Sequence, residues 1–188
     1  MGGIYNSETD QTEWTTHVPL DEQLAHYRAH PPSALAGLTA KPVDVNFAFD
    51  GHGEPVNAVF ELTCPCGSAL FIATAYLEDE EWQPPIALEC TACEAEHVIY
   101  DRSKHGYDAV VGGGGSDEPD DDAVADELTP DDVDVPHQVL IRFEFPSDHL
   151  GGDADVKGRE HDLFSWITIL ARDAQTGDLA FLFDDECA

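Results

Sequence analysis

Apolar and polar residues alternate through much of the chain, and this pattern predicts a protein built mainly from β-strands. In the segment 43–50, valine and phenylalanine occupy every second position, and Asp, Asn and Ala lie between them. A period of two is typical of a strand with one buried face. The segment 138–145 repeats this pattern, so we expect a second half-buried strand there. We interpret the likeness as two similar strands and not as an internal duplication.

Shorter apolar runs predict further strands and one helix. Four strands are expected at 57–64, 68–76, 85–90 and 96–101, with a polar loop at 77–85. Two more are expected on either side of a turn at 173–178. In the segment 19–32, acidic residues come first and basic residues last, followed by two prolines, which predicts a short helix. Leu20, Leu24 and Tyr27 would form its apolar stripe.

These elements predict a mainly β fold in which a small strand module is attached to, or inserted in, a small antiparallel β body. One short helix precedes it near the N-terminus. The expected parts are an N-terminal segment (1–40), a strand of the β body (41–56), the small module (57–111), an acidic disordered linker (112–136) and a β-hairpin region that completes the β body (137–188). The last part is small for an independent core, so we expect it to pack on the strand at 43–49.

The linker is predicted from its composition. Residues 112–136 contain four glycines, ten acidic residues and no basic residue. Glycine makes the chain flexible, and like charges repel one another, so this segment is expected to be disordered.

Acidic residues also predominate outside the linker. The chain has 39 acidic and 8 basic residues, a formal net charge of −31. A diffuse acidic excess suits a protein that stays hydrated in concentrated salt, where screening weakens self-repulsion, so we expect a halophilic host. A basic protein partner or a role as an acidic nucleic-acid mimic would also fit. Direct binding of nucleic acid is disfavoured because it needs a basic patch.

The sequence contains no pattern that predicts membrane insertion. Its apolar runs are shorter than the roughly 20 residues that a spanning helix needs. The first ten residues, MGGIYNSETD, lack the basic and apolar regions of a signal peptide. We therefore expect a cytoplasmic protein without a membrane partner.

Two cysteine pairs are the strongest chemical signal. Cys64 and Cys66 form a C-x-C pair, and Cys90 and Cys93 form a C-x-x-C pair 23 residues later. Four thiolates in two close pairs make a closed tetrahedral shell for zinc, which leaves no open position for catalytic water. A structural zinc site is therefore predicted, and a redox-labile zinc switch or two disulfides are the alternatives. Disulfides are disfavoured in a cytoplasmic chain.

The residue after each pair differs. Gly67 follows Cys66 and allows the tight turn in which backbone N–H groups face the sulfurs, whereas Glu94 stands at the corresponding place after Cys93. On these residues the segment 58–108 resembles the zinc ribbons, although zinc ribbons usually have C-x-x-C in both pairs. The resemblance implies that the small module at 57–111 is a zinc-ribbon-like module. This resemblance implies a rigid, non-catalytic recognition module that presents an acidic surface to a partner.

Two other resemblances involve the same cysteines. With the tail His105, Gly106, Tyr107 and Asp108, the pattern is similar to a group of small uncharacterised prokaryotic proteins that combine C-x-C-G, C-x-x-C and H-G-Y-D. This likeness implies zinc binding and no activity. The C-x-C and C-x-x-C pairs also resemble the zinc centre of the redox-regulated bacterial heat-shock chaperone, in which oxidation releases zinc.

Two candidates remain outside the cysteine pairs. Asp101, His105 and Asp108 could form a small polar site of a hydrolase-like enzyme, with His105 as the acid–base group and a carboxylate that orients it. The alternative is a structural turn, in which Gly106 supplies an unusual backbone angle. Cys187 is predicted to be an exposed, inert thiol, or else a resolving thiol for a switch.

Overall fold

The computed structural model describes residues 3–6, 11–14, 18–45, 56–78, 81–112, 125–128, 136–146, 150 and 156–187. The strands are β1 (Gly3–Asn6), β2 (Gln11–Trp14), β3 (Thr39–Pro42), β4 (Val56–Thr63), β5 (Leu70–Glu78), β6 (Glu81–Cys90), β7 (Glu96–Tyr100), β8 (Ala125–Glu127), β9 (His137–Phe145), β10 (Trp166–Arg172) and β11 (Leu179–Glu186). The helices are α1 (Leu20–Ala29), the short α2 (Tyr107–Val111) and the 3-10 turns η1 (Ser33–Leu35) and η2 (Glu160–Asp162). The predicted mainly β fold with a short helix near the N-terminus is confirmed.

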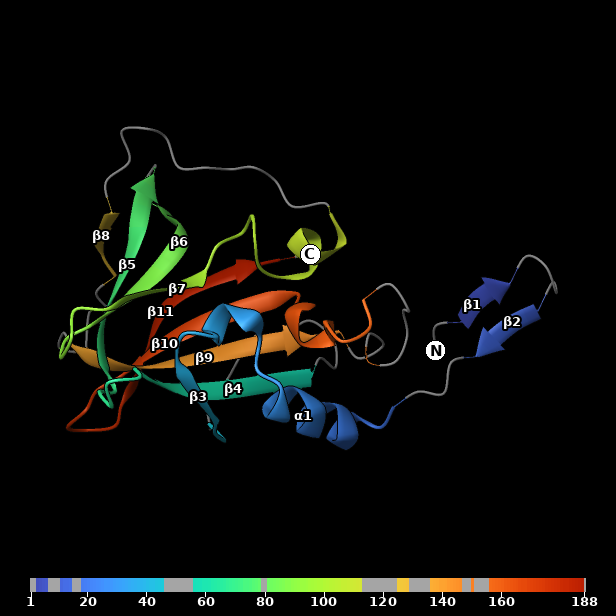
Figure 1. Cartoon of the computed structure of the whole chain (residues 1–188), viewed down its shortest axis with the longest axis horizontal. Helices are drawn as coiled ribbons and strands as arrows, with labels where there is room; N and C mark the ends of the chain where they lie inside the picture. The colour runs from blue at the N-terminus through green and yellow to red at the C-terminus, as the bar shows by residue number, and fades with distance from the viewer. Residues whose placement is uncertain are drawn as a thin grey trace.

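Within the described residues, β3 to β11 form one nine-stranded antiparallel sheet, and β1 pairs with β2 separately. The main strand order is β11-β10-β9-β5-β6-β7 (Figure 1). Strand β9 connects the two halves, because one end of it pairs with β4 and the other end pairs with β5. It is buried on both faces, which differs from the predicted half-buried strand. On one face of β9, Leu140 forms a second apolar cluster with Val59 of β4 and Leu170 of β10.

The first predicted strand lies in a different place. The strand that pairs with β4 is β3 at Thr39–Pro42, and residues 43–45 are not in a strand. The chain still follows β4, because Val43 N–H donates to the Val59 carbonyl at 2.9 Å. The rest of the predicted strand, 46–50, lies outside the described residues. The C-terminal part pairs through β9 with β4, and Val43 and Val45 pack against the cluster of Val59, Leu140 and Leu170, so the expected contact is present at the start of 43–49.

The β5–β6 hairpin is longer than predicted, because most of the expected loop at 77–85 belongs to its two strands. Its pairing shifts between Thr74 and Tyr76, and Pro84 and Pro85 lie in the opposing stretch of β6. Proline lacks the N–H that a regular ladder requires, and a bulge is one of the few places where a sheet accepts it. The prolines thus mark an irregular stretch of strand and not a loop.

Part of the predicted linker is also ordered in the sheet. Strand β8 pairs with β5, and Leu128, which follows it, is 1% exposed. The Leu128 N–H donates to the Ala73 carbonyl at 2.8 Å. Disorder is therefore the wrong prediction for 125–128, whereas residues 113–124 and 129–135 lie outside the described part.

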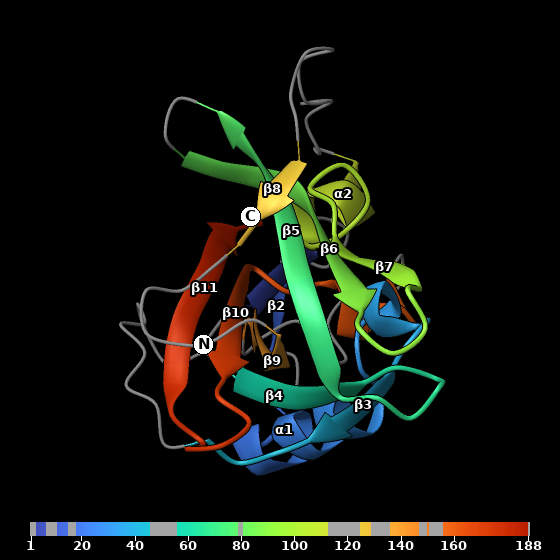
Figure 2. The same ribbon diagram turned by 90° about the vertical axis from the view of Figure 1, so that its left-hand side faces the viewer.

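Helix α1 lies against β3 and β4 in both views (Figure 1 and Figure 2). Its anchor is Tyr27, which is fully buried and stacks on Phe145 with 3.7 Å between ring centroids. Leu20 is 48% exposed, so the predicted apolar stripe is wrong at this position. Gln23 is buried in its place, and its side chain donates to the Val18 carbonyl. None of the helices in the described residues is long and apolar enough to cross a bilayer.

The strands that carry the cysteines are continuous with the rest of the sheet. Both β4 and β5 hydrogen-bond to β9, which belongs to the C-terminal part of the chain. The buried residues of β4 to β7 and those of β9 to β11 therefore form one hydrophobic cluster, which includes Cys64 and Cys90. The expected zinc-ribbon-like module at 57–111 has no boundary of its own in this part of the sheet.

Candidate metal centre

The four cysteines of the two pairs meet at one edge of the sheet. Cys64 and Cys66 lie in the turn between β4 and β5, and Cys90 and Cys93 lie at the turn between β6 and β7. Because Phe71 pairs with Cys90, the hairpin β5–β6 brings both turns to the same end. Thr91 joins the turns further, since its N–H and its hydroxyl both donate to the Leu70 carbonyl at 3.2 Å.

The sulfur positions suit a tetrahedral metal ion. All four Sγ atoms lie within 4.8 Å of one another. The Cys64–Cys93 separation is 3.6 Å and the Cys66–Cys90 separation is 3.5 Å. A tetrahedral site with metal–sulfur bonds of about 2.3 Å places its sulfurs roughly 3.8 Å apart. The two pairs could therefore hold one metal ion with small adjustments.

The two turns close in the same way despite their different lengths. The Gly67 N–H donates to the Cys64 carbonyl at 2.8 Å, and the Glu94 N–H donates to the Cys90 carbonyl at 2.8 Å. The backbone φ angles of these two residues are both positive, 94° for Gly67 and 58° for Glu94. Glu94 therefore adopts the left-handed conformation expected of glycine. The C-x-C turn is a one-residue-shorter version of the C-x-x-C turn.

Backbone N–H groups and neighbouring sulfurs set the ionisation of the thiols. Burial disfavours the thiolate of Cys90, but the N–H groups of Ala92 and Cys93 and the neighbouring sulfurs lower its pKa to about 6. The Cys66 N–H favours the thiolate of Cys64, but burial and the other three sulfurs raise the pKa of Cys64 to about 12. Cys90 therefore ionises more readily than Cys64, and a bound cation would favour the thiolate form of both.

The cluster is buried on one side and exposed on the other. Cys64 and Cys90 are buried, at 3% and 0% exposure, whereas Cys66 and Cys93 are exposed. All five cysteines of the chain are free thiols in the structure, so the predicted alternative of paired disulfides is not the arrangement observed. A metal here would be anchored in the core and open to reagents through two of its sulfurs.

His97 was missed by the sequence reasoning. Its Nε2 lies 3.7 Å from Cys64 Sγ. The sequence did contain a signal for this contact, because His97 follows Cys93, the last cysteine of the second pair, by only four residues. The alternation in β7 conceals it, since a histidine on a strand is usually taken as a surface residue.

The other predicted polar site has a different geometry from the one expected. The Asp101 backbone N–H, and not a carboxylate, donates to His105 Nδ1 at 2.9 Å. The Asp101 carboxylate instead accepts hydrogen bonds from the Ser103 N–H and hydroxyl and pairs with Lys104. Burial lowers the pKa of His105, partly offset by Asp101 and by Asp162. Asp108 lies in α2, and its backbone N–H donates to the Cys187 carbonyl at 3.0 Å.

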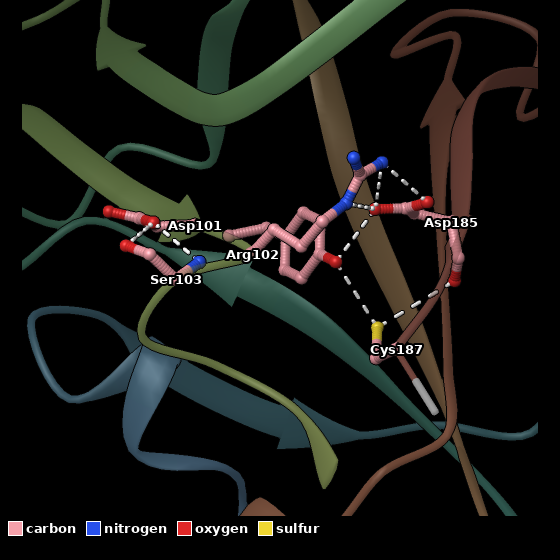
Figure 3. A network of polar contacts seen from close by, with 6 residues as sticks. Asp101, Arg102, Ser103, Asp185 and Cys187 are labelled. Atoms are coloured by element: carbon pink, nitrogen blue, oxygen red, sulfur yellow. Dashed lines mark hydrogen bonds and ion pairs between the residues drawn. The ribbon is translucent and has the colours of Figure 1, made fainter. Parts of the chain in front are cut away.

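Cys187 is buried, which contradicts the predicted exposed thiol. It is 4% exposed, and its Sγ lies 3.3 Å from the Tyr100 hydroxyl. Asp185 accepts hydrogen bonds from Tyr100 at 2.7 Å and from two Arg102 nitrogens at 2.9 Å (Figure 3). Cys187 also lies against Gly106, where an added Cβ would be 2.5 Å from the Cys187 Cβ. These contacts join the end of β7 to the end of β11.

Comparison of the chain with protein-family models, with curated proteins and with solved structures finds no match in any of the three. The functional argument therefore depends on the geometry of the cysteine cluster.

Proposed function

We propose that the protein binds one zinc ion through Cys64, Cys66, Cys90 and Cys93, and that this zinc is structural. The observation that carries the proposal is the approach of four sulfurs to within 4.8 Å at one end of the sheet. Zinc favours four thiolates in a tetrahedral shell, and a shell filled by protein ligands has no position for a reacting water. The ion would hold the β4–β5 and β6–β7 turns together.

The same observations favour a non-catalytic interaction or accessory protein. The metal turns are exposed at Cys66 and Cys93, and they carry Glu94 and Glu96 and no lysine or arginine. With a net charge of −31, the chain would attract a basic partner in solutions of low ionic strength. A turn that a bound metal holds rigid is suited to binding a partner protein, because it loses little conformational entropy on binding.

Elemental analysis tests the metal. Purified protein should contain about one zinc per chain, and Cys90→Ser should lose it and unfold at lower denaturant concentration. Cys187→Ala is the matched control, because it removes the fifth cysteine and should keep the zinc. Wild-type protein that folds equally well after chelation would refute the structural role.

A redox-labile zinc site is the second candidate, and the exposure of Cys66 and Cys93 favours it. Peroxide would oxidise two thiolates to one disulfide and be reduced to two hydroxide ions, and the ion would lose two ligands. Zinc release should then be reversible with a thiol reductant. Retention of zinc under mild peroxide would exclude this candidate and leave the structural site.

A further inference from the structure

His97 lies between the cysteine cluster and the N-terminal segment of the chain. It belongs to β7, where it pairs with Leu88, and it is half-buried. One ring nitrogen, Nε2, lies 3.7 Å from Cys64 Sγ. The other, Nδ1, faces Gly37 so closely that a Cβ on residue 37 would lie 3.1 Å from it. The imidazole thus fills the space between a metal-site sulfur and the turn after η1.

The chemistry of the sulfur determines the direction of the contact. A cysteine that binds a metal is a thiolate and can only accept hydrogen bonds. Contact with Nε2 therefore requires that this nitrogen carries the proton. Hydrogen bonds to the ligands of a metal orient them and tune its affinity.

The charge of the site makes such a donor useful. A divalent ion with four thiolates carries a net charge of −2, and the turns 64–68 and 90–97 contain Glu94 and Glu96 but no lysine or arginine. Backbone N–H groups stabilise several of the sulfurs. In the described part of the chain, the His97 side chain brings a ring nitrogen within hydrogen-bond distance of a sulfur of this cluster.

The turn on the other side of the ring belongs to a docked segment. Leu35 of η1 is 2% exposed, and the Leu38 N–H donates to the Leu35 carbonyl at 2.9 Å. The Ser33 N–H is bound by the Asp162 carboxylate at 2.7 Å. Residues 33–38 are therefore packed in place, and Gly37 provides the room that the His97 ring occupies.

We propose that His97 is a positioning residue of the metal site, which donates its Nε2–H to Cys64 and links metal occupancy to the docking of residues 33–38. The proposal rests on the metal site proposed above. It assigns no ligand role to His97, because the four-sulfur group does not include it.

Two substitutions at His97 separate the donor from the shape of the ring. His97→Phe keeps a planar ring without an N–H, and His97→Gln keeps an amide N–H near the place of Nε2. We expect His97→Phe to lose zinc to a chelator about 10- to 100-fold faster than wild type, and His97→Gln to recover most of the difference. Val98→Thr, at an exposed and uncharged position of the same strand, is the control and should match wild type.

Cobalt substitution gives a readout that a structural role alone would not change. With Co(II) in place of zinc, the sulfur-to-metal charge-transfer band should shift in His97→Phe and stay near its wild-type position in His97→Gln. Both measurements use folded protein, verified by circular dichroism.

Gly37→Ala tests the same ring without changing it. The added methyl group would lie 3.1 Å from Nδ1, so the ring must shift by a few tenths of an ångström, which disturbs the contact of Nε2 with Cys64. We expect faster zinc loss in this variant and little additional loss in the double variant with His97→Phe, because both act through one contact. Ala36→Ser, at the exposed neighbouring position, is the control.

The link to the N-terminal segment is measured by hydrogen exchange. The Leu38 amide should exchange more slowly in the zinc-bound than in the chelated wild-type protein, and this difference should shrink in His97→Phe. If the wild type binds zinc but His97→Phe releases zinc at the wild-type rate and has the wild-type cobalt spectrum, the role of His97 is refuted and the zinc site stands. Wild-type protein that binds no zinc would refute the proposed function together with this role.

Discussion

At the residue scale, the two cysteine turns share a backbone conformation that their sequences do not. Gly67 reaches a positive φ at no steric cost, whereas Glu94 has a side chain that crowds the following carbonyl. Glu94 keeps the conformation because the turn hydrogen bond to Cys90 and the position of Cys93 require it. A non-glycine residue in this conformation stores strain of about 1 kcal/mol.

Glu94→Gly should therefore stabilise the folded protein by about 1 kcal/mol, measured by denaturant unfolding with zinc bound. Glu96→Gly is the matched control, because it removes the same charge from a strand position, where glycine should destabilise by about 0.5–1 kcal/mol. Equal changes in the two variants would show that charge, and not backbone conformation, determines the effect.

Cys187 provides a pH prediction at the same scale. Burial, with Asp185 and Asp108, raises the pKa of Cys187 to about 12, although the hydrogen bond from Tyr100 and the charge of Arg102 oppose the shift. An unfolded cysteine has a pKa of about 8.5. Between these values the unfolded chain has lost a proton that the folded chain retains, so the free energy of unfolding decreases as the pH rises.

The expected slope from this group is up to about 1.4 kcal/mol per pH unit above about pH 9. Cys187→Ala should have a shallower slope than wild type when both are unfolded in urea at a series of alkaline pH values. Burial also raises the pKa of Tyr100, which adds to the decline in both proteins. Identical slopes for the two proteins would contradict the buried, protonated thiol.

At the element scale, strand β8 shows how a short apolar anchor can order a polar segment. The three residues of β8 are exposed, and the stretch 112–136 is rich in acidic residues and glycine, so its composition predicts disorder. Leu128 changes the outcome because its side chain enters the core beside β5. The backbone hydrogen bond to Ala73 then aligns the preceding residues with the edge of β5.

Leu128→Ala should reduce the free energy of unfolding by about 2–4 kcal/mol, since it removes a buried side chain and leaves a cavity. Glu127→Ala, at the exposed neighbouring position, should change it by less than about 0.5 kcal/mol. Denaturant unfolding of both variants measures the difference. Wild-type stability in Leu128→Ala would show that β8 does not dock in solution.

At the scale of the whole molecule, opposite ends of the strand order come together. Tyr100 and Arg102 at the end of β7 bind Asp185 in β11, so the outermost strands of the main order are joined at one corner (Figure 3). This contact lies at the end of β7 opposite the turn that carries Cys90 and Cys93. The sheet is therefore held at two places, by side-chain hydrogen bonds and by the proposed zinc.

The net charge of −31 opposes this compact state. Screening lengths decrease from about 10 Å at 0.1 M salt to about 3 Å at 1 M, so added salt should relieve the repulsion between acidic groups. We expect the melting temperature to rise by about 5–10 °C between 0.1 M and 1 M KCl, measured by scanning calorimetry. A neutral osmolyte of equal osmolality is the control, and an equal rise with both would argue against a screening effect.

The local pattern of the sequence was enough to locate most strands and the group of four cysteines that could hold a metal ion. The alternating pattern located β9, and shorter apolar runs located β4, β5, β7, β10 and β11, because strand pleating depends on neighbouring residues along the chain. The spacing of Cys64, Cys66, Cys90 and Cys93 predicted their assembly, since two close pairs can reach one centre. The metal itself and its structural role remain proposals from that chemistry.

Only the tertiary structure decided which distant segments meet. The pairing of β4 with β9, the burial of Cys187 against Gly106 and the contact of His97 with Cys64 join residues far apart in sequence. No local pattern encodes these contacts, because they depend on how the whole core packs. Residues 125–128 and Cys187 look exposed in isolation, and each has a defined place where the fold provides a partner for it.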